Sequence, residues 1–269
     1  MNAFRQLLKS SGAHPPVGTW ISSAHPLVAE AIGCAGFDWG LVDMEHAPLE
    51  LGGLVHVLQA LAGTKLLPVV RVPWNDAVTV KRVLDAGATT LMFPFVQSPD
   101  EARRAVAATR YPPEGVRGLA GTSRATRFGT TPNYFRNANQ GIGVIAQIET
   151  PQAVERIEAI AAVEGIDALF VGPNDLSAAL GHIGETTHPA VVSLMAQAVQ
   201  RCKALGVPVG TLGSSAEAVA QYRAIGFDFV AVSSDIGFMM RAAKEAIAAL
   251  RTRDTEHVHT LASGTQQPA

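Results

Sequence analysis

Short apolar runs alternate with longer amphipathic segments along most of the chain. This alternation is typical of repeated β-α units that build a parallel sheet. We expect strands at Val17–Ser22, Trp39–Glu45, Leu66–Val72, Thr90–Val96, Gly143–Glu149, Ala168–Gly172, Val207–Leu212 and Phe229–Ser233. Helices are expected between them, at Pro26–Cys34, Leu51–Leu61, Asp76–Ala86, Pro99–Ala108, Pro151–Ala162, Val191–Leu205, Ala216–Ile225 and Gly237–Leu250.

This succession of β-α units predicts an α/β fold of the TIM (β/α)8 barrel type. A doubly wound open sheet is the alternative, and it would carry a glycine-rich phosphate loop after its first strand. The segment Ser22–His25 follows the first expected strand and is no such loop, so we expect the barrel and no nucleotide cofactor. We assign residues 1–251 to a single barrel domain and the polar residues 252–269 to a disordered tail.

Composition narrows the class of protein. The chain has 269 residues, of which 48% are hydrophobic and 16% charged, so a disordered chain is excluded. Its net charge of −2 leaves no basic surplus for a nucleic-acid backbone. No signal peptide and no apolar run long enough to span a membrane is expected. The two cysteines, Cys34 and Cys202, suit a reducing cytoplasm.

Polar side chains follow most of the expected strands, although the strand interiors are apolar. In a TIM barrel the working residues lie at the carboxyl ends of the strands, where a shared ligand gives such groups a reason to converge. Glu149 and Asp175 close two neighbouring strands, and two carboxylates suit a hard cation such as Mg²⁺ or Mn²⁺. The alternative is that both carboxylates only cap the helices that follow.

Three further residues are candidates for chemistry. Arg71 ends the third strand, where its guanidinium suits a carboxylate or a developing oxyanion; the alternative is an ion pair with Glu45 or Glu149. His46 lies three residues after Asp43, which can orient the imidazole, although such a histidine is often only a packing residue. None of the lysines ends an expected strand, so a Schiff-base mechanism is disfavoured. They are Lys9, Lys65, Lys81, Lys203 and Lys244.

Four of these strand ends carry a resemblance. The segments Trp39–His46, Val70–Pro73, Gln147–Thr150 and Phe170–Ser177, in this order, resemble the HpcH/HpaI aldolase family. That family includes 4-hydroxy-2-oxoheptanedioate and 2-dehydro-3-deoxyglucarate aldolases, and the likeness runs from about Gly18 to Arg241. It implies a modified TIM barrel whose last helix is exchanged between subunits. It also implies a homo-oligomer, commonly a hexamer built as a trimer of dimers.

The resemblance implies a class II pyruvate aldolase that needs a divalent metal, Mg²⁺, Mn²⁺ or Co²⁺. Such an enzyme reversibly cleaves a 4-hydroxy-2-oxo acid to pyruvate, or hydroxypyruvate, and an aldehyde. By motif, Glu149 and Asp175 correspond to the metal ligands and Arg71 to the group that binds the enolate oxygen. His46, assisted by Asp43, corresponds to the proton-transfer group. The substrate site is implied to include Arg71, Trp20, Gln147, Gly172, Pro173, Asn174, Asp175 and Leu212.

Two other functions fit the same residues. An acyl-CoA lyase of the malyl-CoA or citryl type uses the same metal-enolate chemistry but needs extra surface for its nucleotide. A non-catalytic barrel that senses a small acid is the third possibility, and the convergence of acid, arginine and histidine argues against it.

Asn174 departs from the alanine common in the family, and an amide there could shift the nucleophile towards hydroxypyruvate.

Overall fold

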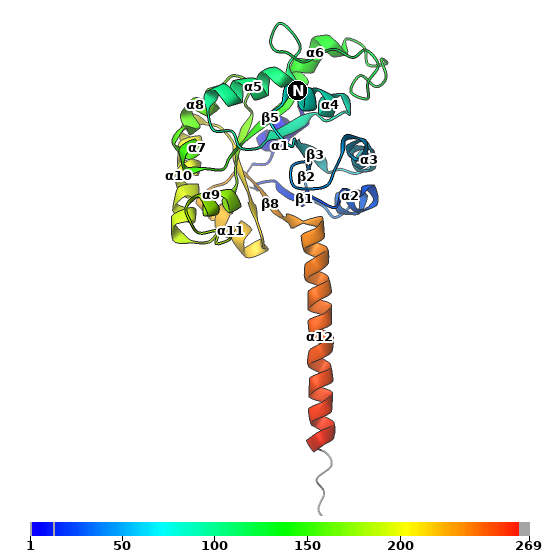
Figure 1. Ribbon diagram of the computed structural model, residues 1–269, viewed down its shortest axis with the longest axis vertical. Helices are drawn as coiled ribbons and strands as arrows, with labels where there is room; N and C mark the ends of the chain where they lie inside the picture. The colour runs from blue at the N-terminus through cyan, green and yellow to red at the C-terminus, as the bar shows by residue number, and fades with distance from the viewer. Residues whose placement is uncertain (1, 13, 264–269) are drawn as a thin grey trace, which may run out of the picture.

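The computed structural model describes residues 2–12 and 14–263. Its eight parallel strands pair in chain order and close into one barrel, which confirms the expected fold (Figure 1). The strands are β1 (Val17–Ile21), β2 (Trp39–Asp43), β3 (Leu67–Arg71), β4 (Thr90–Phe93), β5 (Gly143–Ile148), β6 (Ala168–Val171), β7 (Val209–Gly213) and β8 (Phe229–Ser234). Each lies within about three residues of its expected bounds, because the apolar runs that predicted the strands are the segments that the barrel buries.

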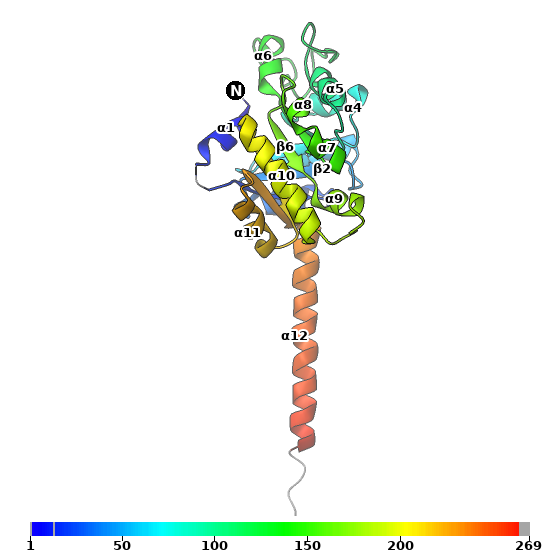
Figure 2. The same cartoon turned by 90° about the vertical axis from the view of Figure 1, so that its left-hand side faces the viewer.

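Helices surround the barrel (Figures 1 and 2). They are α1 (Ala3–Ser10), α2 (Pro26–Gly33), α3 (Leu51–Leu61), α4 (Ala77–Asp85), α5 (Pro99–Thr109), α6 (Tyr134–Gly141), α7 (Pro151–Glu155), α8 (Ile157–Ala161), α9 (Pro173–Ala179), α10 (Pro189–Leu205), α11 (Ala216–Ile225) and α12 (Asp235–Ser263). The sequence did not predict α1 or α6, and the single helix expected at Pro151–Ala162 is divided at Arg156.

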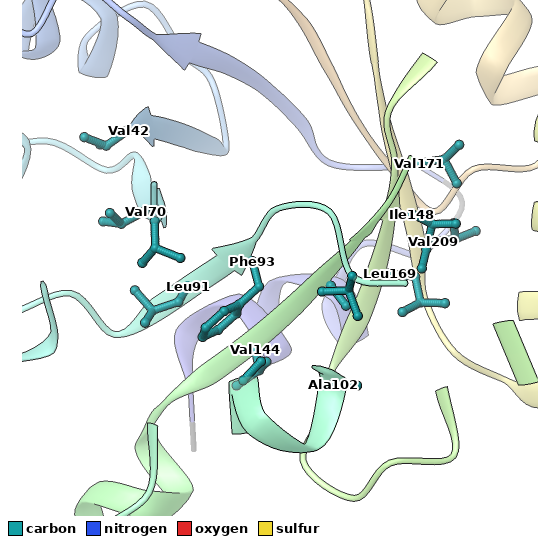
Figure 3. Packing of buried hydrophobic residues seen from close by; sticks show 14 of the residues in the cluster. Val42, Val70, Leu91, Phe93, Ala102, Val144, Ile148, Leu169, Val171 and Val209 are labelled. Carbon is teal, nitrogen blue, oxygen red and sulfur yellow. The ribbon is translucent and has the colours of Figure 1, made fainter. Parts of the chain in front are cut away.

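The strands alternate between two apolar layers, as the period of two in a β-strand requires. One layer lies between the strands and the helices, and Figure 3 shows part of it, with Val42, Val70 and Leu91 from three adjacent strands. The other layer fills the barrel itself. It consists of Phe4, Trp20, Trp39, Leu41, Val69, Met92, Ile145, Ala168, Phe170, Phe229 and Ala231. The barrel is therefore a packed core, and space for a ligand remains only at its ends.

Helix α12 departs from the pattern of the other helices, because it projects away from the barrel (Figures 1 and 2). It continues past the end expected at Leu250 and covers twelve residues of the segment predicted as a disordered tail. Residues 252–263 contain no glycine or proline, so nothing in the backbone chemistry stops the helix before Gly264. Residues 264–269 lie outside the described part of the chain. None of the helices described here has the length and apolar content that crossing a bilayer requires.

Candidate active site

The polar residues at the carboxyl end of the barrel continue the interior face of their strands. Trp39 and Leu41 of β2 point into the barrel, and Asp43 lies two residues further along. In the same way Arg71 follows Val69 on β3, and Gln147 follows Ile145 on β5. The alternation that buries apolar side chains inside the barrel therefore also aims these polar groups at its open end.

A cavity of about 570 Å³ opens at this end of the barrel. Its lining includes every residue that the sequence analysis proposed for the site, namely Trp20, Asp43, His46, Arg71, Gln147, Glu149, Gly172, Pro173, Asn174, Asp175 and Leu212. Ser22, Phe170, Thr186, Gly213, Ser214, Ser233 and Ser234 complete the lining. Side chains and backbone from most of the strand ends thus meet around one space, as the positions of the strand ends predicted.

A larger cavity of about 880 Å³ lies elsewhere, next to α6 and the residues that precede β4 and β5. Arg124 and Arg127 line it, and its lining contains no carboxylate and no histidine among the described residues. The Arg124 guanidinium also donates a hydrogen bond to the Ala86 carbonyl oxygen (2.9 Å). Because this cavity lies away from the carboxyl ends of the strands and no carboxylate lines it, we do not assign the chemistry of the barrel to it.

Arg71 is the centre of a buried charge network. Its Nε and Nη2 atoms donate to the two Asp43 oxygens at 2.9 and 2.7 Å, and its Nη1 lies 2.7 Å from Oε2 of Glu45. The Asp43 contact follows from the strand register, which places Asp43 of β2 directly beside Arg71 of β3. Burial alone lowers the pKa of Arg71, but the hydrogen bond and charge of Asp43, with Glu45, outweigh it and raise that pKa. The guanidinium is therefore held charged and in a fixed orientation.

Glu149 is buried at the end of β5, and both of its oxygens accept hydrogen bonds. The Phe95 backbone N–H donates to Oε2 (2.8 Å) and the Gln147 side-chain amide donates to Oε1 (3.0 Å). Burial raises the pKa of Glu149 to about 7; the Phe95 hydrogen bond opposes this shift, and the nearby charge of Asp175 adds to it. Burial disfavours the ionised form of this carboxyl group, and a bound cation would stabilise that form.

The donor set and the space around it fit a divalent ion. Glu149 and Asp175 line the same cavity, and Asp175 raises the pKa of Glu149 by its charge, so the two carboxylates interact. Oε1 of Gln147 is buried with no hydrogen-bond partner, which leaves an oxygen available to a ligand or a metal-bound water. Gly172 approaches Glu149 so closely that a Cβ there would lie 2.8 Å from Oε1. The oxygen-only donors match a hard cation.

The structure corrects one sequence-based expectation, the pairing of the Asp43 carboxylate with the His46 imidazole. Both Asp43 oxygens bind Arg71, and Oδ1 also accepts from the backbone N–H groups of Glu45 and His46. The carboxylate near the His46 imidazole is Glu45, with Nε2 and Oε2 3.7 Å apart. Asp43 therefore orients Arg71 and the turn, while the exposed His46 imidazole has Glu45 as its carboxylate neighbour.

The sequence analysis gave no catalytic or binding role to two residues of the site. It considered Glu45 only as an alternative ion-pair partner of Arg71, and the structure confirms that ion pair; Glu45 also lies 3.7 Å from His46. Its spacing of two from Asp43 continues the interior face of β2, and this signal was available in the sequence. Phe95 has a left-handed backbone (φ 54°) and directs its N–H at Glu149. No simple sequence signal marks a phenylalanine for that conformation.

Comparisons with known proteins agree with this geometry. The family model for HpcH/HpaI aldolase/citrate lyase matches residues 17–242. The chain is 49% identical to a 2-dehydro-3,6-dideoxy-6-sulfogluconate aldolase of Pseudomonas putida, over 92% of this chain and 96% of the relative. It is 46% identical to a 5-keto-4-deoxy-D-glucarate aldolase of Citrobacter koseri, over 86% of this chain and 90% of the relative.

A solved structure supports the same assignment. A HpcH/HpaI aldolase/citrate lyase family protein from Burkholderia cenocepacia superposes with a TM-score of 0.89 at 42% identity, covering 93% of this chain and all of that chain. The match includes the barrel and the strand ends that form the cavity. The chain therefore belongs to the HpcH/HpaI aldolase/citrate lyase family, as an enzyme that makes and breaks carbon–carbon bonds.

Proposed function

We propose that this enzyme reversibly cleaves a 4-hydroxy-2-oxo acid to pyruvate, or hydroxypyruvate, and an aldehyde. The observation that carries the proposal is the buried Arg71, fixed by Asp43 beside the Glu149 and Asp175 carboxylates in one cavity. The cavity thus contains the fixed positive charge of Arg71 and two carboxylates that suit a cation. Both positive charges would attract the carboxylate and carbonyl oxygens of a 2-oxo acid. The names of the two aldolase relatives support the same reaction type.

Glu149 and Asp175 are the residues that would hold the divalent metal ion, Mg²⁺, Mn²⁺ or Co²⁺. The citrate lyase beta subunit of M. tuberculosis, solved in complex with oxaloacetate and magnesium, has the same fold at 19% identity and a TM-score of 0.54. When bound, such an ion supplies Lewis-acid stabilisation of the negative charge that develops on the 2-oxo oxygen. Gln147, whose Oε1 is buried without a hydrogen-bond partner, lines the same cavity.

The residues of this chain then divide the remaining work. Arg71 binds the 2-oxo oxygen through the second hydrogens of its Nη atoms, since Asp43 and Glu45 engage the others. His46 accepts the proton of the C4 hydroxyl as the C3–C4 bond breaks. The electron pair of that bond becomes the pyruvate enolate, and C4 leaves as the aldehyde. The proton held by His46 then returns through water to C3 of the enolate, which releases pyruvate and restores the imidazole.

The pyruvate half of the substrate lies against the backbone at the start of α9. Gly172, Pro173 and Asn174 line the cavity there, and Trp20 and Leu212 supply apolar walls. The Trp20 ring lies 5.8 Å from Cζ of Arg71 and so limits where the guanidinium can move. We propose that the Asn174 amide beside this half of the site allows the hydroxyl of hydroxypyruvate to be accepted.

Metal removal and a choice of substrates test the proposed reaction. We expect the chelator-treated enzyme to release no pyruvate from a 4-hydroxy-2-oxo acid, and Mg²⁺, Mn²⁺ or Co²⁺ to restore the activity, measured with a coupled dehydrogenase. Borohydride with pyruvate should leave the mass of the protein unchanged, since no lysine lines the cavity. Full activity without metal, a trapped adduct, or faster cleavage of malyl-CoA would each contradict the proposal.

We further propose that the chain works as a homo-oligomer, a hexamer built as a trimer of dimers, with α12 exchanged between subunits. Over residues 236–250 the helix exposes the apolar side chains of Ile236, Met239, Met240, Ile247 and Leu250. A second copy of the chain is a partner that would cover them. Light scattering should give a smaller particle when these residues are replaced by serine; an unchanged mass would contradict the exchange.

We place the reaction in the cytoplasm. Cys34 and Cys202 are both free thiols, and Cys34 is exposed. An exposed free thiol is suited to a reducing compartment. Fractionation of cells that make the protein would test this placement.

A further inference from the structure

A second group of side chains with metal-ligating atoms lies in the connection between α9 and α10, and none of its three residues lines the catalytic cavity. His182, Glu185 and His188 each offer a ligand atom, and these atoms all lie within 4.8 Å of one another. The two imidazoles are stacked, with ring centroids 3.4 Å apart and planes 17° apart. The three side chains are exposed or partly exposed, so an ion can reach them from solvent.

Backbone turns hold the three residues at their spacing. The Glu185 N–H donates to the His182 carbonyl oxygen (2.9 Å), and the His188 N–H donates to the Glu185 carbonyl oxygen (3.0 Å). Two successive four-residue turns, which share Glu185, thus bring the three side chains close together. Ser177 of α9 anchors its start, because its carbonyl oxygen accepts from the His182 N–H (2.8 Å) and its Oγ accepts from the Gly184 N–H (3.2 Å).

We propose that His182, Glu185 and His188 form a binding site for a transition-metal ion of the Zn²⁺ type, separate from the site at Glu149 and Asp175. Two imidazoles and one carboxylate form a donor set that zinc accepts, with water as the fourth ligand. Nitrogen donors favour zinc over magnesium, whereas the all-oxygen donors in the barrel favour magnesium. The two sites therefore differ in the metal that they select.

Binding requires small, specific changes in the two rings. Two nitrogens on a tetrahedral zinc ion are about 3.4 Å apart, given Zn–N bonds of about 2.05 Å. The distance of 3.4 Å between the two rings joins their centroids, and the lone pairs lie in the ring planes, so the stacked rings must tilt until one nitrogen of each ring points at the ion. Nδ1 of His188 accepts a hydrogen bond from the Ala190 N–H (3.2 Å). The ion either replaces that bond at Nδ1, or binds Nε2 after the proton has moved to Nδ1.

The site has a route to the substrate through Thr186. This residue lies between Glu185 and His188 and lines the catalytic cavity. Its side chain is also a hydrogen-bond partner of the buried Tyr222 of α11. An ion bound to the residues on either side of Thr186 fixes this part of the cavity wall, so the ion acts by positioning rather than by contact with the substrate.

Zinc binding to the full-length protein tests the proposal. In a Glu149→Gln, Asp175→Asn background, calorimetry should show one zinc ion per chain. His182→Gln and His188→Gln should each weaken binding at least about 30-fold and Glu185→Gln about tenfold, because each removes one ligand. His56→Gln, an exposed histidine on α3, and His257→Gln with His259→Gln are controls that should change nothing.

Amide hydrogen exchange provides a second test, which does not need the Glu149→Gln, Asp175→Asn variant and so remains possible if that variant does not fold. In the otherwise unchanged enzyme with excess Mg²⁺, Zn²⁺ should slow amide exchange across residues 182–188, and His188→Gln should abolish the effect. No zinc bound in either protein, or equal zinc binding by the histidine variants, overturns the proposal. Neither readout depends on the aldolase reaction, so the two proposals fail independently.

Discussion

The same eight strands form both ends of the barrel, but aromatic side chains fill the interior of one end and ionisable side chains line the other. At the amino-terminal end, Phe4 of α1 closes the barrel by packing edge-on against Trp39 and Phe229, with ring centroids 5.9 and 5.4 Å apart. At the carboxyl-terminal end, Asp43, Arg71 and Glu149 occupy equivalent interior positions and are buried ionisable groups. One end is filled by its own side chains, and the other leaves a cavity.

The comparison indicates that residues at one end of the barrel stabilise the fold, whereas residues at the other end carry the chemistry. The aromatic end gains from burial of apolar area and ring contacts, and two glycines make room for it. A Cβ at Gly18 or Gly210 would lie 2.3 Å from the ring of Trp39 or Phe229, respectively. The charged end carries groups whose burial costs free energy unless they are paired, and Oε1 of Gln147 has no partner at all. A ligand or metal ion bound in the cavity would give such groups further partners.

The largest effect should come from the charged end. We expect Arg71→Ala to lower kcat/KM about 10³-fold, because it removes the fixed positive charge from the 2-oxo oxygen. It should also destabilise the fold, since Asp43 is left buried without its partner. Steady-state kinetics against Arg82→Ala, an exposed arginine on α4, measures the effect. A rate near that of the unchanged enzyme would remove Arg71 from the mechanism.

The opposite result is expected at the aromatic end. Phe4→Ala should lower the free energy of unfolding by about 3–5 kcal/mol, because it leaves a hole between Trp39 and Phe229. The value of kcat/KM should stay unchanged wherever the variant remains folded. Urea denaturation measures the first quantity, with Phe128→Ala as an exposed control. A loss of kcat in the folded variant would show that the two ends are not separable.

The pH dependence of metal binding sharpens the account of the charged end. Burial raises the pKa of Glu149 to about 7, so in the metal-free protein its carboxyl holds a proton below that pH. A metal ion must displace this proton, and its affinity should fall about tenfold per pH unit below pH 7 and level off above it. Mn²⁺ binding followed by electron paramagnetic resonance from pH 5.5 to 8 measures the slope.

Glu149 also makes the free energy of unfolding depend on pH, and here a rise in pH lowers stability, whereas it strengthens metal binding. Because the folded-state pKa of Glu149 lies above its ordinary value, its contribution to stability is present at low pH and is lost as the pH rises through about 7. The metal-free protein should therefore become less stable over this range, and metal should reverse the loss. Glu149→Gln should remove both pH dependences. A flat affinity in the unchanged enzyme would contradict the buried, protonated carboxyl.

The smallest effect is expected where α1 begins. The Asn2 side chain accepts from the Phe4 N–H (3.0 Å) as a helix cap and donates to the carbonyl oxygens of Thr89 (2.8 Å) and Gly141 (3.0 Å). Asn2→Ala should lower the free energy of unfolding by about 1–2 kcal/mol and leave kcat/KM unchanged. Urea denaturation with Asn137→Ala, exposed on α6, is the matched comparison. No loss of stability would mean that the cap does not hold α1 in place.

The missed elements show where local pattern is insufficient. Helix α1 has only eight residues, and so short a helix is marginal alone in water. Partners far away in the sequence hold it, including the ion pair of Arg5 with Asp167. The pairing of Asp43 was misassigned for a related reason. His46 is near in sequence, but the register of β2 and β3 places Arg71 directly beside Asp43.

The sequence by itself determined the barrel, because the alternation of apolar runs and amphipathic segments assigns each strand and each interior position locally. It also determined which residues meet at the cavity, since closing parallel strands in order brings all of their carboxyl ends to one edge. The tertiary structure alone decided how those residues pair: Arg71 with Asp43 and Glu45, and Glu149 with Phe95 and Gln147. Pairing depends on register and on backbone conformation across strands, and neither is written in the local pattern of a single strand.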